Sequence, residues 1–196
     1  MAASNATVVS LTEREITADM IDGCRRGERE PFRALYDAYK DKVYSICLYY
    51  FHGDRAAAAD ATQQVFLKLM TTIGQFRGNA DFSTWLYRLV ANTCIDGARR
   101  ARAREARVAP EVLVDSLPGS ASQEEDLVRA QRARLVQEAL SALPPNFRLA
   151  ILLRYFDELS YDEMARVLRC SMGTVASRLN RAQKLLASKL EALRNA

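Results

Sequence analysis

The stretch that decides the fold is LSYDEMARVLRCSMGTVASRLNRAQKLL, residues 159–186. Ser160 and, three residues later, Glu163 form the capping-box pattern that starts a helix. Apolar residues at helical spacing follow, and the segment 169–173 then predicts a turn before a last helix that reaches roughly residue 193. A short helix, a turn of about four residues and a longer basic helix match the outline of a helix-turn-helix.

The predicted last helix has two unlike faces. The apolar stripe consists of Val175, Leu179, Ala182, Leu186 and Leu190. The nearly opposite stripe consists of Thr174, Ser177, Arg178, Arg181 and Lys184. Because arginine can pair with guanine in the major groove and lysine with phosphate, the second stripe is a candidate recognition surface for duplex DNA. A solvated basic face is the alternative interpretation, but the capped helix and turn before it favour DNA.

Helical periodicity also extends through the rest of the chain. Apolar residues recur every three or four positions from 32 to 47, and a second helix is predicted over about 55–73. Ser83 is expected to cap a long helix from 84 to about 104. Further helices are predicted over 126–142 and 146–157. With only 8 glycines and 5 prolines in 196 residues, we expect an all-α fold rather than a β-sandwich or barrel.

A change of composition divides the chain into two small domains. The segment PEVLVDSLPGSASQEE, residues 110–125, has two prolines, a glycine, three serines and no basic residue, which is typical of an exposed linker. We therefore expect a flexible tail over 1–20, a first helical domain over 21–105, an acidic linker over 106–127 and a second helical domain over 128–196.

The segment 75–104 interleaves aromatic, basic and amide side chains. Phe76, Arg77, Asn79, Phe82, Trp85, Tyr87 and Arg88 are followed by Arg99, Arg100, Arg102 and Arg104. Aromatic stacking combined with a positive groove is how proteins hold single-stranded nucleic acid, and an extruded base needs a loop pocket. The alternative interpretation is that Phe82 and Trp85 belong to the hydrophobic core and that the arginines form a solvated face.

The net charge of +4 and the isoelectric point near 9.0 give only a weak indication of a polyanionic partner. The distribution along the chain is more informative. Residues 97–107 have a net charge of +4, residues 111–128 a net charge of −5, and residues 166–196 a net charge of +6. Two basic regions are therefore separated by an acidic connector.

Several function classes are disfavoured. The four cysteines at 24, 47, 94 and 170 are widely spaced and His52 is the single histidine, so we expect buried reduced thiols and no metal site. No catalytic constellation or glycine-rich phosphate loop occurs, so we expect neither an enzyme nor a cofactor. Without an apparent signal peptide or apolar span, a soluble cytoplasmic protein with no membrane insertion is expected.

Taken together, the motifs resemble the extracytoplasmic-function (ECF) sigma factors, the small two-domain sigma subunits of bacterial RNA polymerase. In the first domain the resemblance rests on Asp60-Ala-Thr-Gln-Gln-Val-Phe-Leu-Lys68, Phe76-Arg-Gly78, Phe82-Ser-Thr-Trp-Leu-Tyr-Arg88, Asn92-x-x-x-Asp96 and Arg99-Arg100. In the second it rests on Leu143-Pro-x-x-x-Arg148, Leu159-Ser-Tyr-x-Glu163-Met-Ala165 and Gly173-Thr-Val-x-Ser-Arg-Leu179-x-Arg-Ala182. The resemblance spans about 21–193.

The resemblance implies a factor that binds core RNA polymerase, directs it to promoters and promotes DNA melting, under the control of an anti-sigma factor. The residues that would face the polymerase are Asp60, Gln63, Gln64, Lys68, Phe147, Leu152 and Phe156. Those that would bind or support the melted minus-ten element are Arg77, Asn79, Trp85, Arg88, Asn92, Asp96, Arg99 and Arg100. Those that would read the duplex minus-thirty-five element are Thr174, Ser177, Arg178 and Arg181, to which we add Lys184 from the same stripe.

The chain departs from the family pattern in two places. Ala59-Asp60-Ala61 stands where relatives usually have Glu-Asp-Leu, and Gln64 replaces a usual Glu, so the polymerase-facing surface is less acidic. Ala176 stands where relatives commonly have Lys or Arg.

Two rival hypotheses are a stand-alone helix-turn-helix regulator and a nucleic-acid enzyme. The regulator would bind an operator on its own but leaves the 76–104 segment without a role, and the enzyme would need an acidic metal site.

Overall fold

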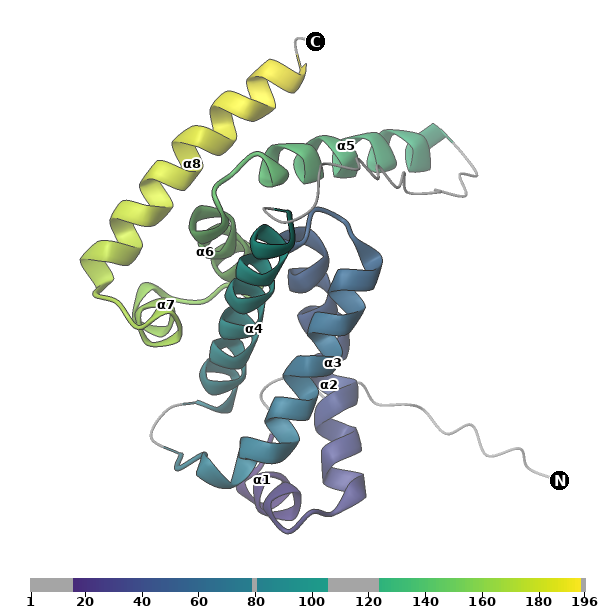
Figure 1. Ribbon diagram of the computed structural model, residues 1–196, viewed down its shortest axis with the longest axis vertical. Coiled ribbons are helices and arrows are strands. Elements are labelled where there is room, and N and C mark those ends of the chain that lie inside the picture. The colour runs from purple at the N-terminus through teal and green to yellow at the C-terminus, as the bar shows by residue number, and fades with distance from the viewer. Residues whose placement is uncertain (1–15, 79–80, 106–123, 195–196) are drawn as a thin grey trace, which may run out of the picture.

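The computed structural model describes residues 16–78, 81–105 and 124–194, and every regular element within these ranges is a helix (Figure 1). The expected all-α fold is confirmed. In chain order the elements are α1 (Ala18–Arg25), α2 (Arg29–Tyr50), α3 (Arg55–Thr72), the 3-10 helix η2 (Ile73–Gln75), α4 (Phe82–Glu105), α5 (Glu124–Ser141), α6 (Pro145–Tyr155), α7 (Tyr161–Leu168) and α8 (Met172–Arg194).

The first domain is a bundle in which α2, α3 and α4 run beside one another and α1 lies across one end (Figure 1). Leu35, Tyr39, Val43 and Ile46 recur at helical spacing on α2 and are completely or almost completely buried. Gly97 explains how α4 can approach the end of α2, because a Cβ atom there would lie 2.7 Å from Cζ of the Phe51 ring.

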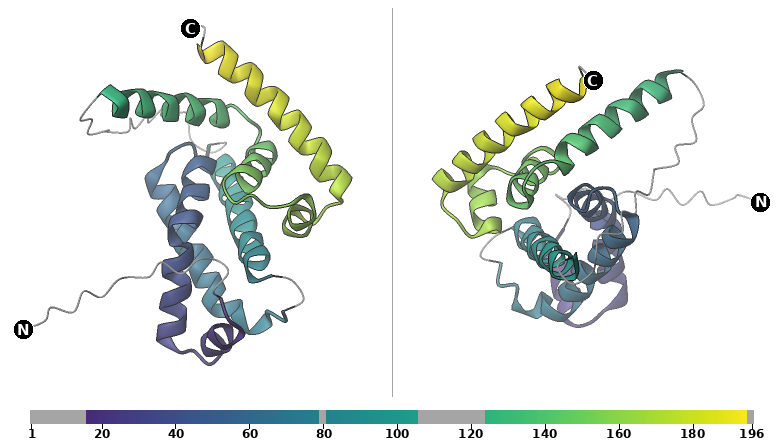
Figure 2. Two further views of the ribbon diagram at one scale, coloured as in Figure 1. Left: turned by 180° about the vertical axis from the view of Figure 1, so that it is seen from behind. Right: turned by 45° about the horizontal axis from the view of Figure 1, so that its top comes forward.

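The second domain places α6 and α7 between the first domain and α8 (Figure 2). Its core includes Leu149, Leu153 and Met164, against which Val175 and Leu179 of α8 are buried. The helix α8 therefore lies on the outside of the molecule, away from α3.

The helix boundaries differ from the expected ones mainly at the amino-terminal ends. Helix α1 begins at Ala18, inside the expected tail 1–20, because the Thr17 side chain caps it by accepting from the Met20 amide at 3.3 Å. Helix α4 begins at Phe82, so the expectation that Ser83 caps it is wrong. The carbonyl of Asp81 already accepts the first helical hydrogen bond, from the Trp85 amide at 3.2 Å.

The expected linker 106–127 ends earlier than predicted. Helix α5 begins at Glu124, so residues 124–127 are helical rather than part of the connector. Acidic residues stabilise the first turn of a helix through the helix dipole, which explains why this acidic run starts α5. The rest of the expected linker, and residues 1–15 of the expected tail, lie outside the described residues.

The two domains pack against each other around one buried arginine. The Arg148 side chain on α6 is 3% exposed, and its guanidinium donates to the carbonyls of Leu140, Ser141 and Leu143 at 2.8 Å each. Its Nη1 also donates to the carbonyl of Tyr50, at the end of α2, at 2.5 Å. The same guanidinium therefore closes the turn between α5 and α6 and fastens that turn to the first domain.

Two further contacts join the domains. The Tyr87 hydroxyl of α4 donates to the Asp157 carboxylate at 2.6 Å, and the Tyr49 ring of α2 lies 4.7 Å from the Phe156 ring between centroids. Helix α4 also packs directly against α7. The described domains thus form one packed unit rather than two separate bodies.

We predict that Arg148→Met lowers the free energy of unfolding by about 3 kcal/mol, because four carbonyl oxygens, three of them in buried hydrogen bonds, lose a charged donor. Urea denaturation followed by circular dichroism measures this change. Arg134→Met, at an exposed position of α5, is the matched control. An equal effect of the two substitutions would show that the buried guanidinium does not stabilise the fold.

Candidate nucleic-acid interface

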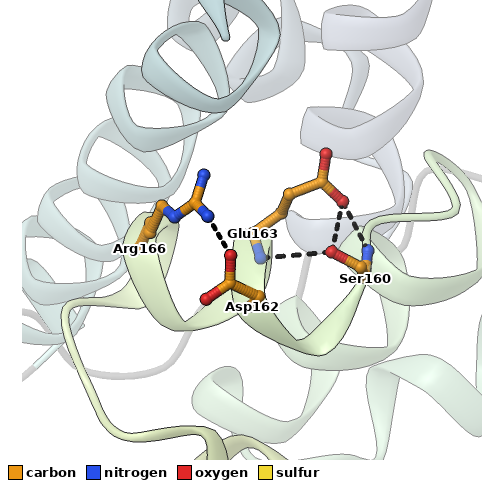
Figure 3. A network of polar contacts seen from close by, with 4 residues as sticks. All are labelled: Ser160, Asp162, Glu163 and Arg166. Atoms are coloured by element: carbon orange, nitrogen blue, oxygen red, sulfur yellow. Dashed lines mark hydrogen bonds and ion pairs between the residues drawn. The ribbon is translucent and has the colours of Figure 1, made fainter. Parts of the chain in front are cut away.

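The helix-turn-helix predicted from the sequence is present, and its first helix is tightly capped (Figure 3). The Ser160 hydroxyl accepts from the Glu163 amide at 3.3 Å, and the Glu163 carboxylate accepts from the Ser160 amide at 2.7 Å. Asp162 forms an ion pair with Arg166 one turn later. The capping box therefore fixes where α7 starts and hence where the following turn lies.

The turn between α7 and α8 is shorter than expected. Arg169 ends α7 in the left-handed conformation, with φ of 51°, and α8 already begins at Met172. The Ser171 hydroxyl accepts from the Thr174 amide at 3.2 Å, which caps the start of α8. Gly173, expected in the turn, lies inside the helix.

Helix α8 has the two faces that its sequence predicts. Val175, Leu179 and Ala182 are buried in the second domain, and Leu186 is half-buried. Of the candidate recognition residues, Arg178 is half-buried, and the exposed ones are Thr174, Ser177, Arg181 and Lys184. These five side chains lie on one outward-facing side of a single rigid helix, which is the arrangement that major-groove recognition requires.

Trp85, the aromatic residue of the candidate minus-ten site, packs with two phenylalanines in the hydrophobic core. The Trp85 ring is 9% exposed and lies 5.6 Å from the Phe76 ring and 6.0 Å from the Phe82 ring, between centroids. Tyr39 extends this cluster into the core at 5.9 Å from Phe82. The hypothesis that Phe82 and Trp85 are core residues is therefore correct for most of their surface.

The polar candidates for the minus-ten site follow α4 along its length. Arg77 is exposed just before the helix, and Arg88 is half-buried one turn beyond Trp85. Further along, the exposed members are Asn92, Asp96, Arg99 and Arg100. Spacings of three and four residues keep most of these side chains on one side of the helix. Asn79 lies outside the described residues.

Two of the candidate polymerase-facing residues on α3 are directed toward α4. The Gln64 Oε1 atom accepts from Arg100 Nη2 at 3.0 Å, and Lys68 Nζ donates to Thr93 Oγ1 at 3.1 Å. Asp60 and Gln63, by contrast, are exposed. The expected polymerase surface on α3 is therefore divided between residues that bind α4 and residues that face outward.

The outward part of α3 is more apolar than its sequence suggested. Leu67 and Met70 are 52% and 56% exposed, and together with Tyr36 of α2 they line a groove of about 1100 Å³ that also contains Gln63. The sequence does contain a pattern that predicts this groove. Apolar side chains occupy more of the circumference of α3 than neighbours on one side of the helix can bury.

The three candidate polymerase residues of the second domain have different environments. Phe147 is half-buried, and Leu152 is completely buried in the core. Leu152 is therefore not accessible to a partner in this arrangement, because α2, α4, α7 and α8 all pack against α6. Phe156 is 40% exposed but packs on Tyr49 of the first domain.

The cysteines are free, and three of the four are buried: Cys24, Cys47 and Cys94, while Cys170 is half-buried. A hydrogen bond with Cys47, together with burial, raises the pKa of the Cys94 thiol well above its usual value, so this thiol stays protonated near neutral pH. Within the described residues, no group of three or more His, Cys, Asp or Glu side chains is placed to hold a metal ion. No helix within the described ranges has the length and apolarity needed to span a membrane.

Each half of the chain matches a known protein-family model. Residues 35–104 match the model of sigma-70 region 2, and residues 133–186 match the model of sigma-70 region 4. The ECF RNA polymerase sigma factor SigW of Bacillus subtilis is 32% identical over 181 residues, covering 86% of this chain and 94% of that protein. The chain belongs to the ECF sigma factors. Within this family, the ECF RNA polymerase sigma-E factor of Escherichia coli K12 is 32% identical over 195 residues, covering 93% of this chain and 98% of that protein.

Solved structures share the fold of this sigma factor. The sigma factor RpoE of Bartonella quintana, in complex with the anti-sigma factor NepR, has a TM-score of 0.64 at 21% identity; the match covers 82% of this chain and 96% of that one. CnrH, in complex with the cytosolic domain of CnrY, has a TM-score of 0.65 at 20% identity; the match covers 89% of this chain and 96% of that one. At these identities the likeness concerns the fold alone.

We predict that Ser160→Ala lowers the free energy of unfolding of this sigma factor by about 1 kcal/mol, because the amide of Glu163 loses its cap. Thermal unfolding followed by circular dichroism measures the loss. Ser188→Ala, at an exposed interior position of α8, is the matched control and should not destabilise the protein. A capping role for Ser160 is excluded if both variants unfold at the temperature of the parent protein.

Proposed function

We propose that this sigma factor holds promoter DNA at two places, with α8 on the duplex minus-thirty-five element and the Arg77–Arg100 region on the melted minus-ten element. The observation that carries the proposal is the outward face of α8, whose polar side chains take no part in the core. Thr174, Ser177, Arg178, Arg181 and Lys184 supply donors that suit base edges and phosphates of the major groove.

For the minus-ten element, the proposal relies on the mixed character of α4 and the segment before it. The residues are Arg77, Asn79, Trp85, Arg88, Asn92, Asp96, Arg99 and Arg100. The exposed arginines suit the phosphates of a single strand, and the amide of Asn92 suits a base edge. Because Trp85 is mostly buried, its proposed role is to support the binding surface rather than to offer a full ring for stacking.

Core RNA polymerase is the proposed partner of α3 and α6. Asp60 and Gln63 are exposed and can contact it directly, whereas Gln64 and Lys68 would first release Arg100 and Thr93. Phe147, Leu152 and Phe156 would form the second contact, which requires that Phe156 leaves Tyr49 and that α6 becomes accessible. The proposed first domain keeps its limits of 21–105, whereas the proposed second domain starts at Glu124 with α5 rather than at residue 128.

An anti-sigma factor is the proposed regulator, because RpoE, a protein of the same fold, was solved in complex with the anti-sigma factor NepR. CnrH, also of this fold, was solved with the cytosolic domain of CnrY. We further propose that the chain works in the cytoplasm, where bacterial transcription takes place, and that it has no catalytic activity of its own.

The first test is binding to core RNA polymerase. In a pull-down, the full chain should retain core polymerase, and the reconstituted holoenzyme should transcribe from a cognate promoter that neither component uses alone. Absence of core binding would refute the sigma-factor function.

A second test separates the two DNA contacts. Arg178→Ala or Arg181→Ala should weaken holoenzyme binding to a minus-thirty-five duplex about tenfold or more, because a bidentate base contact discriminates by about 1–3 kcal/mol. Asn92→Ala should leave this duplex binding unchanged but reduce promoter opening, measured by permanganate footprinting.

Lys189→Ala, at an exposed position beyond the recognition stripe, is the matched control for the α8 variants. If Arg181→Ala and Asn92→Ala affect the same step, the proposed division between the two domains is wrong.

A further inference from the structure

A pocket of about 400 Å³ lies where the first turn of α4 meets α7 of the second domain. Three arginines line it: Arg77 before α4, Arg88 on α4 and Arg166 on α7. None of the described residues that line the pocket is acidic. Three guanidinium groups around one small cavity make it a strongly positive site whose chemistry suits phosphate.

The arginines have unused donors. Among the described residues, Arg77 and Arg88 have no ion-pair partner, and Arg166 pairs with Asp162 through a single nitrogen. A guanidinium has five N–H donors, so Arg166 can bind Asp162 and a second anion together. The pocket can therefore offer several charge-assisted hydrogen bonds without breaking a contact that the structure records.

The second observation is an orphaned hydroxyl. Thr84 also lines the pocket, is 4% exposed, and its Oγ1 atom is buried without a hydrogen-bond partner. Buried hydroxyls are normally hydrogen-bonded, because an unsatisfied one costs about 1–3 kcal/mol. A bound oxyanion would satisfy this hydroxyl, and the first turn of α4 adds partial positive charge at the same place.

We propose that this pocket binds the phosphate groups of a small phosphorylated molecule, and that the bound ligand holds the two domains together. Arg166 comes from the second domain and Arg77 and Arg88 from the first, so a ligand contacting all three bridges the domains. Tyr87 and Asp157 already hold α4 against the second domain.

The proposal has a regulatory consequence that rests on the proposed function. Arg77 and Arg88 are assigned there to the single DNA strand, so the phosphorylated ligand and the strand would compete for them. The ligand would also stabilise the packed arrangement in which Phe156 lies on Tyr49. Phosphate binding would thus keep the sigma factor from the melted DNA strand and from core polymerase.

Trp85 provides the readout, because it is the single tryptophan of the chain and lines the pocket. We expect inorganic pyrophosphate, titrated into the full chain at constant ionic strength, to change the Trp85 fluorescence saturably. Arg166→Gln should weaken this binding about tenfold, the effect of removing one charged hydrogen-bond partner. Arg134→Gln, an exposed arginine of the same domain outside the pocket, is the matched control and should bind as tightly as the parent.

Thr84→Val tests the orphaned hydroxyl. Since this hydroxyl has no partner, its removal should not lower the unfolding temperature of the free protein, yet it should weaken pyrophosphate binding several-fold. A matched titration with a short single-stranded oligonucleotide shows whether the pocket prefers the phosphates of a small molecule or those of a DNA backbone.

No saturable response to pyrophosphate, or equal affinity of the parent and Arg166→Gln, would overturn the proposal. A response to the oligonucleotide alone would also overturn it and would assign the pocket to the DNA backbone. Core polymerase binding is measured separately from pyrophosphate binding. A negative pyrophosphate titration therefore does not argue against the sigma-factor function, and a negative core-binding result does not affect the conclusion about the phosphate pocket.

Discussion

The packing of the whole molecule depends on how the charge of Arg148 is satisfied inside the protein. Burial lowers the pKa of its guanidinium below the usual value, but an arginine stays charged at neutral pH, so the charge must be compensated. Three carbonyls of the α5–α6 turn and the carbonyl of Tyr50 provide that compensation. Because the last of these belongs to the first domain, separation of the domains would expose part of this charge to water.

The same constraint connects the fold to the proposed activity. The proposed binding of core polymerase at α6 would require Phe156 to leave Tyr49, and this movement would also disturb the contact between Arg148 and Tyr50. Water can replace the carbonyl of Tyr50, whereas the three carbonyls of the turn stay with the second domain. Separating the two domains therefore costs much less free energy than replacing the arginine. Arg148 can thus stabilise the second domain permanently and the contact between the domains reversibly.

Much of the fold could be predicted from periodicity and capping. The capping box at Ser160 and the stripe through Val175 and Leu179 are local patterns, and local patterns are what a sequence displays directly. The family motifs likewise identified the two sigma regions. What could not be predicted depends on neighbours distant in sequence: Leu152 is buried because several helices cover α6, and Met70 is exposed because no helix in the described ranges covers that side of α3. Gln64 and Lys68 face α4 for the same reason, since only the assembled bundle decides which side of α3 is inner.

The outward face of α8 has an evolutionary consequence. Thr174, Ser177 and Arg181 are exposed, whereas the residues that hold the helix in place lie on its opposite side. Substitutions on the exposed side have little effect on the folding free energy, because a surface substitution away from packed side chains usually changes it by no more than about 0.5 kcal/mol. If α8 reads promoter DNA as proposed, duplicated copies of such a gene can acquire new promoter preferences by drift and selection at a few surface positions, without passing through unstable intermediates.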